Sequence, residues 1–83
     1  MNESTKLLLI KVLKKITGRD FTNIDENTDL KNHLNLDSIQ IVELFAALEE
    51  ETGMELPLEI MNCRNIKDFL KIFEETIKYR INS

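Results

Sequence analysis

Along this chain, apolar residues recur every three or four positions, the spacing that gathers them on one face of a helix. No segment alternates apolar and polar residues over the length of a strand. We therefore expect an all-α fold, a small bundle of three long helices and one short helix, with a long loop between the first two. The helices are predicted over about residues 4–17, 37–52, 57–62 and 65–80.

Residue types that begin and end helices stand at these limits. Ser4 and Asn65 can each accept a bond from a free backbone N–H at a helix start. Gly18 and Gly53 can take the left-handed conformation that ends a helix. Pro57 has a preset φ that suits the opening of the short helix.

The helix predicted over residues 37–52 carries the most informative start. Asp37 stands before it and Gln40 follows three residues later, an approximate capping box. If Asp37 takes the capping role, the Ser38 hydroxyl is left free in solvent at the positive end of the helix. The helix is expected to turn Ile41, Leu44, Phe45 and Leu48 inward and to hold Glu43, Ala47 and Glu50 on another face.

The polar loop over residues 19–36 is longer than most connections between helices. Its apolar side chains are expected to pack against the helices and so hold the loop in place; they are Phe21, Ile24, Leu30, Leu34 and Leu36. Asp25, Asn27 and Asp29 match the first three ligand positions of a calcium-binding EF-hand loop. Leucines stand at its sixth and twelfth positions, where glycine and a bidentate glutamate belong. We therefore predict no metal site.

The charge distribution points to protein partners. The formal net charge is −4, yet no lysine or arginine lies between Asn32 and Cys63, a stretch with seven acidic residues. Such an acidic surface repels phosphates, so we expect no nucleic acid as partner, and it suits proteins with basic patches. The alternative is that the acidic face is only solvated and binds no partner.

Length and cysteine content set further limits. With 83 residues the chain is expected to form one domain. The apolar run Leu7–Ile10 ends at Lys11, too early for a signal peptide or a membrane span. A lone Cys63 forms no internal disulfide, so we expect a cytoplasmic protein. The Cys63 side chain is expected to be a small, partly buried hydrophobe. No unexplained apolar stripe calls for a second copy, which favours a monomer.

The run Asp37–Glu51 resembles the recognition helix of discrete bacterial acyl carrier proteins, in which Asp-Ser-Leu or Asp-Ser-Ile opens the second helix. The segments Asn27–Leu30, Gly53–Pro57 and Asn65–Phe69 are similar to that family's loop, helix exit and last helix start. Many fatty-acid carriers have Gly-Ala before the Asp-Ser and an acid two residues after the serine; here those places hold Asn35-Leu36 and Gln40.

The resemblance implies an acyl-carrier-like bundle that bears 4′-phosphopantetheine on Ser38, with Asp37 supporting the attachment site. It also implies that a phosphopantetheinyl transferase, with Mg²⁺, transfers this group from coenzyme A. Acyl cargo would travel as a thioester to acyl-transferring or condensing enzymes of fatty-acid, polyketide or related biosynthesis. Residues implied in docking these enzymes through their basic patches are Ile39, Val42, Glu43, Ala46, Glu49 and Glu50.

Two other functions remain open. A stand-alone aminoacyl or peptidyl carrier would use the same chemistry at Ser38, and a helical adaptor would bind a basic partner without modification. A serine hydrolase is disfavoured, because the only histidine is His33 and no Gly-x-Ser-x-Gly elbow surrounds Ser38. We therefore expect no catalytic residue, and we expect His33 to lie in the solvated loop.

Overall fold

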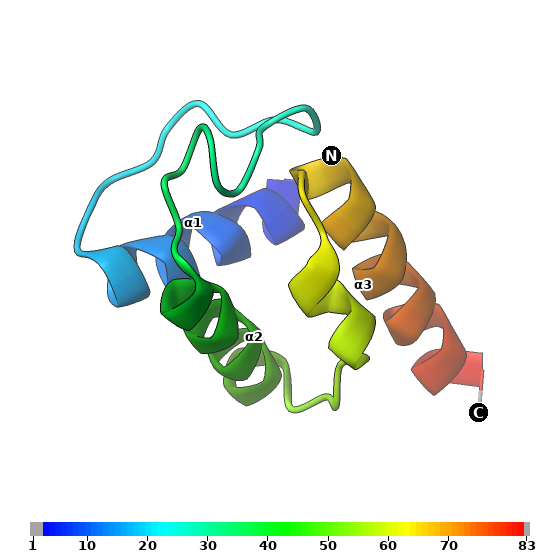
Figure 1. Cartoon of the computed structure of the whole chain (residues 1–83). Helices are drawn as coiled ribbons and strands as arrows, with labels where there is room; N and C mark the ends of the chain where they lie inside the picture. Colours follow the sequence, from blue (N-terminus) through cyan, green and yellow to red (C-terminus); the bar gives the residue numbers. More distant parts are fainter. Residues whose placement is uncertain (1–2, 83) are drawn as a thin grey trace.

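The computed structural model describes residues 3–82 and the side chains of residues 3–78. Its elements are α1 (Glu3–Thr17), α2 (Ser38–Thr52), the short 3₁₀ helix η1 (Leu58–Asn62) and α3 (Ile66–Asn82) (Figure 1). Residues 3–82 form no strand, and their one β-bridge pairs Asp29 with Asn65. The predicted fold class, three long helices and one short helix with a long first loop, is confirmed.

The helix ends after the first follow the residue types expected there, whereas the prediction for Ser4 was wrong, because Ser4 lies inside α1, which begins at Glu3. Gly18 and Gly53 both have left-handed backbones, with φ of 73° and 68°. The Asn65 side chain accepts a bond from the Asp68 backbone N–H at 2.9 Å and so caps α3. Pro57 lies just before η1 rather than inside it, with φ −65° and ψ 143°.

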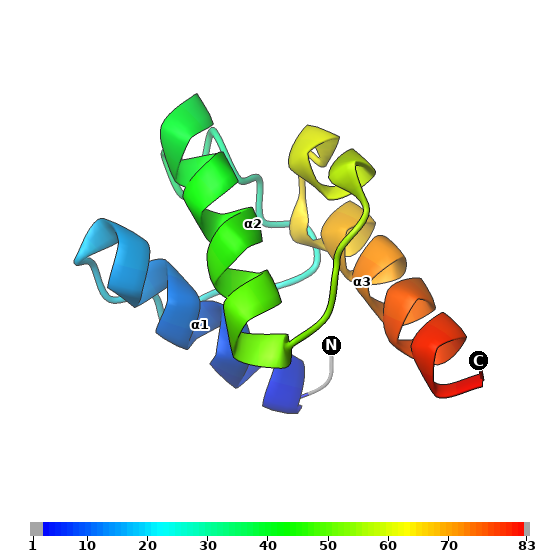
Figure 2. The same ribbon diagram turned by 90° about the horizontal axis from the view of Figure 1, so that it is seen from below.

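The helices are joined into a bundle through η1. α1 packs on α2, while η1 contacts both α2 and α3 and so bridges them. Figure 2 shows η1, drawn in yellow-green, beside the first half of α2. None of the described helices is long and apolar enough to cross a bilayer.

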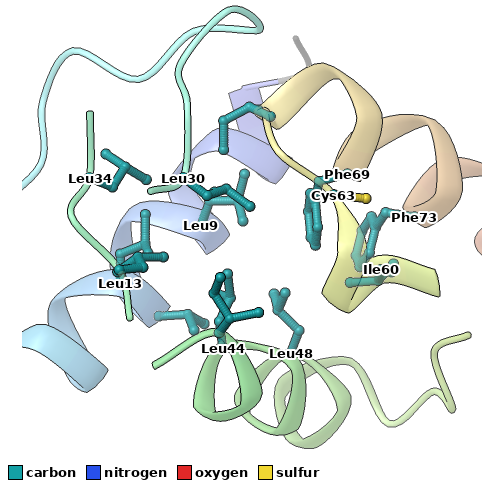
Figure 3. Packing of buried hydrophobic residues seen from close by; sticks show 14 of the residues in the cluster. Leu9, Leu13, Leu30, Leu34, Leu44, Leu48, Ile60, Cys63, Phe69 and Phe73 are labelled. Atoms are coloured by element: carbon teal, nitrogen blue, oxygen red, sulfur yellow. The ribbon is translucent and has the colours of Figure 1, made fainter. Parts of the chain in front are cut away.

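The core is built from one face of each helix together with the loop (Figure 3). Phe69 and Phe73 of α3 stack with their ring centroids 5.6 Å apart. Full burial of a large aliphatic or aromatic side chain stabilises a fold by about 1.5–3 kcal/mol. The expected packing of the loop against the helices is confirmed, since Ile24, Leu30, Leu34 and Leu36 are buried and Phe21 is half-buried.

The prediction for Ala47 was wrong, because this residue is 8% exposed and belongs to the core. Ala47 follows Leu44 by three positions, so both fall within the face that α2 turns inward. Phe45, which was expected in the inward stripe, is only partly buried and packs against the core cluster from outside. The buried face of α2 is thus rotated slightly from the predicted one.

Candidate functional site

The start of α2 is fixed by a reciprocal pair of hydrogen bonds. Asp37 Oδ1 accepts from the Gln40 backbone N–H at 2.7 Å, and Gln40 Oε1 accepts from the Asp37 backbone N–H at 3.2 Å. This is a capping box, with Asp37 in the extended conformation of an N-cap residue. The predicted capping role of Asp37 is confirmed, and Gln40 is its partner.

Ser38 is the first residue of α2 and is exposed. Within residues 3–82, its hydroxyl takes part in no hydrogen bond, and its backbone N–H and that of Ile39 have no protein acceptor. A helix start with free N–H groups favours an anion, because the helix dipole places partial positive charge there. The site therefore offers an accessible hydroxyl beside donors that suit a phosphate group, which fits a phosphopantetheine arm.

The residues just before the serine explain two departures from the fatty-acid carrier pattern. Asn35 has a left-handed backbone, with φ of 55°. Asparagine tolerates this conformation better than most residues other than glycine, so it can stand where glycine is common. Leu36 is buried in the core, and its N–H donates to the Leu30 carbonyl at 3.1 Å. The loop is thus anchored two residues before Ser38.

Further upstream, Asp29 organises the turn that leads to this anchor. Its carboxylate accepts from the backbone N–H groups of Lys31 and Asn32, at 2.9 and 2.8 Å, while its own N–H donates to His33 Nδ1 at 2.8 Å. The bond from Asn32 lowers the pKa of the Asp29 carboxyl, and the Lys31 N–H and the charge of Arg64 act in the same direction, against partial desolvation. His33 itself is exposed, as expected.

Contacts between distant segments hold this loop in place. Arg19 Nη2 donates to the Leu34 carbonyl at 2.6 Å, and its guanidinium lies 5.0 Å from the centre of the Phe21 ring. On the other side, the Leu30 N–H donates to the Arg64 carbonyl at 2.8 Å. Sequence reasoning missed the role of Arg19, because no local motif links positions 15 residues apart.

The residues predicted to dock partners mostly lie on the solvent side of α2. Ile39 and Val42 are 71% and 53% exposed, an unusual degree for large apolar side chains. Ala46, Glu43 and Glu50 are exposed as well. The apolar members Ile39, Val42 and Ala46 are separated from one another by three and four positions, which keeps them on one face of the helix.

Glu49 differs from these residues. It is half-buried, and its Oε2 accepts from the Leu56 backbone N–H at 2.9 Å. A half-buried carboxylate that accepts a backbone hydrogen bond presents less of its charge to a partner than the exposed Glu43 and Glu50 do. Glu49 thus ties the end of α2 to the segment over residues 53–57 that leads to η1.

The environments of Cys63 and Asp25 bear on the thiol and metal chemistry considered from the sequence. Cys63 is buried, and desolvation, with a contribution from the charge of Asp68, raises the pKa of its thiol. The Asp25 carboxylate accepts from the Asn27 N–H at 2.8 Å. No group of three or more histidine, cysteine or acidic side chains among the described residues is arranged to hold a metal ion.

Comparison with known proteins identifies the relatives of the chain. Residues 8–73 match the family model described as "Phosphopantetheine attachment site". An acyl carrier protein homolog of Ureaplasma parvum is 30% identical over 80 residues, which are 94% of this chain and 100% of that protein. An acyl carrier protein of Coprothermobacter proteolyticus is 31% identical over 83% of this chain and 85% of its own length. A non-reducing polyketide synthase of Gibberella zeae is 33% identical over 78% of this chain but only 3% of that protein.

Proposed function

The chain belongs to the acyl carrier protein family, whose cofactor is 4′-phosphopantetheine, and on that premise we propose that Ser38 is the residue that bears the arm. The observation that carries this proposal is the division of roles at the start of α2. Asp37 caps the helix with its own side chain, so the exposed Ser38 hydroxyl has no structural duty. Ser38 is therefore available for modification without loss of a cap.

The attachment requires a partner enzyme, because a serine hydroxyl is a weak nucleophile without an activating base. A phosphopantetheinyl transferase would supply that chemistry: Ser38 Oγ bonds to the phosphorus that carries the pantetheine, a base of the transferase takes the hydroxyl proton, and the pyrophosphate bond of coenzyme A breaks to release its nucleotide part. When bound, the arm supplies a terminal thiol that holds acyl cargo as a thioester. The free N–H groups of Ser38 and Ile39 are donors that could bind the phosphate of the attached arm. The chain itself contributes a handle and a recognition surface, not catalysis.

We infer that partners recognise an apolar and acidic face of α2, the docking face, formed by Ile39, Val42, Glu43, Ala46 and Glu50. Its exposed apolar residues offer area that binding can bury, and its carboxylates attract the basic patches of acyl-transferring and condensing enzymes of fatty-acid or polyketide synthesis. A small contact steered by charge suits a carrier that must bind several enzymes in turn. We assign Glu49 mainly to holding the segment over residues 53–57, since its carboxylate is bound to Leu56.

The direct test incubates the purified chain with coenzyme A, Mg²⁺ and a broad-specificity phosphopantetheinyl transferase, followed by intact-mass analysis. We expect wild type to gain one phosphopantetheine and Ser38→Ala to gain none. Ser4→Ala is the matched control, because Ser4 is also an exposed serine near a helix start, and it should load like wild type. Loading of Ser38→Ala would refute the site. A wild-type chain that never gains mass would point to an unmodified helical adaptor.

A further inference from the structure

The segment over residues 34–37 carries the chain from the loop into α2 (Figure 1), so its conformation determines where Ser38 lies. Two backbone bonds shape it from within the loop. The Leu34 N–H donates to the Asp29 carbonyl at 3.1 Å, and the Leu36 N–H donates to the Leu30 carbonyl at 3.1 Å. Burial of the two leucine side chains holds the segment against the core, but hydrophobic burial is non-directional and does not fix the orientation of a peptide group.

A side chain from a distant part of the chain supplies that orientation. Arg19, which lies just after α1, donates from Nη2 to the Leu34 carbonyl at 2.6 Å. This is the one hydrogen bond that the carbonyl accepts among the residues that the structure describes. A bond from a charged donor is shorter and stronger than a bond between neutral groups. It therefore fixes the plane of the peptide that joins Leu34 to Asn35.

The Arg19 side chain is itself held in place from α1 and from the loop. Its backbone N–H donates to Thr17 Oγ1 at 3.1 Å, and this hydroxyl donates to the Leu13 carbonyl inside α1 at 2.6 Å. Its guanidinium lies 5.0 Å from the centre of the Phe21 ring, and a cation over an aromatic face is attracted to it. Contacts thus run without a break from the end of α1 to the Leu34 carbonyl.

The peptide that Arg19 fixes directly precedes the left-handed residue Asn35. A residue other than glycine keeps such a conformation only where its surroundings hold it there. The Arg19 bond acts on the peptide before Asn35, and the bond from the Leu36 N–H acts just after it. Ser38 follows three residues later, so the direction in which the chain leaves this turn sets the position of its hydroxyl.

We propose that Arg19 is a positioning residue for the modification of Ser38: through the Leu34 carbonyl, it holds the chain before α2 in the conformation that the transferase accepts. This inference rests on the proposed function. Without the bond, the segment populates other conformations as well. The apparent affinity of a partner falls with the fraction of molecules in the competent conformation, so the KM for the carrier rises while kcat is unchanged.

The test measures steady-state loading of three variants with coenzyme A, Mg²⁺ and the same broad-specificity transferase, at varied carrier concentration. Arg19→Gln removes the charged donor and should raise KM about three- to tenfold with kcat unchanged. Arg19→Lys keeps a positive charge and one donor, so its KM should lie between those of wild type and Arg19→Gln. Lys15→Gln is the matched control, because it removes the same charge from an exposed position near the end of α1, and it should load like wild type.

Hydrogen exchange, measured by NMR without the transferase, separates positioning from direct contact with that enzyme. In Arg19→Gln the Leu36 N–H, which is bound to the Leu30 carbonyl, should exchange about threefold faster or more, because the segment opens locally. The Phe73 N–H, in the middle of α3, should exchange as in wild type, because the fold as a whole is intact. Lys15→Gln should change neither rate.

Several results would overturn the inference. One is a wild-type KM for Arg19→Gln, and another is an equal rise in KM for Lys15→Gln, which would assign the effect to net charge. A raised KM with unchanged exchange at Leu36 would mean that Arg19 contacts the transferase itself. Loss of helical circular dichroism in Arg19→Gln would show that the whole fold needs the residue. Failure of wild type to load at all would instead refute the proposed function, so the two failures are distinguishable.

Discussion

Glu49 Oε2 accepts a hydrogen bond from the backbone N–H of Leu56 at 2.9 Å. This bond closes the segment between α2 and η1 and thereby sets where η1 lies beside the docking face. Leu56 is buried, so its N–H would lose its protein acceptor if the carboxylate were removed. The acidic run at the end of α2 therefore contains residues with different duties.

Replacing Glu49 should accordingly destabilise the fold, whereas replacing its neighbour should not. We expect Glu49→Ala to lower the free energy of unfolding by about 1–2 kcal/mol, because a buried donor is left unsatisfied. Glu50→Ala removes an exposed carboxylate and should change it by less than about 0.5 kcal/mol. Urea unfolding followed by circular dichroism measures both. Equal losses in the two variants would contradict the assigned role of Glu49.

Asn35 provides a test of the backbone before the serine. Its φ of 55° suits glycine and asparagine but disfavours β-branched residues. We expect Asn35→Val to lower the free energy of unfolding by about 1–2 kcal/mol and Asn35→Gly to leave it nearly unchanged. Chemical unfolding of the three proteins decides the matter. Tolerance of valine without loss would mean that the left-handed conformation is not needed.

Charge reversal tests the acidic part of the docking face. The double variant Glu43→Lys/Glu50→Lys should slow loading several-fold at low salt and lose most of this difference at high salt, because salt screens exposed charges. The control Glu74→Lys/Glu75→Lys changes the net charge equally on exposed positions of α3. Loading rates are measured by intact mass over time. Unchanged rates for the α2 variant at low salt would show that Glu43 and Glu50 do not steer partners.

Acid stability should depend on Asp29. Its pKa is lowered in the folded state, so the ionised carboxylate favours folding at neutral pH, and this contribution is lost as the pH falls below about 4, the ordinary range of aspartate, through the folded-state pKa. Asp29→Asn keeps an oxygen acceptor for the turn but does not titrate. Unfolding free energies measured from pH 7 to pH 2 should therefore fall less steeply at the acid end for this variant. Parallel profiles would rule out the proposed linkage.

Local patterns were enough to predict much of the fold and the start of α2. The helices, their glycine ends and the Asp37–Gln40 cap all depend on residues within a few positions of one another. The bonds from Arg19 to Leu34 and from Leu56 to Glu49 could not be predicted, because they arise only when separate segments meet in the fold. Ala47 was misplaced because alanine is small enough for either face of a helix.

The exposure of Leu58 illustrates the same limit. A leucine between Pro57 and Ile60 reads equally well as core or surface in the sequence. Only the 3₁₀ form of η1 decides which row of side chains faces inward. The side of a short helix that faces the core therefore cannot be predicted from periodicity alone.

The most direct measurement is the mass of this protein when purified from the cells that make it, with fragmentation to locate any added group. The account predicts a population that bears a single phosphopantetheine on the fragment containing Ser38. Protein that is entirely unmodified at this serine, and that no competent transferase can load, would contradict the claim that Ser38 bears the arm.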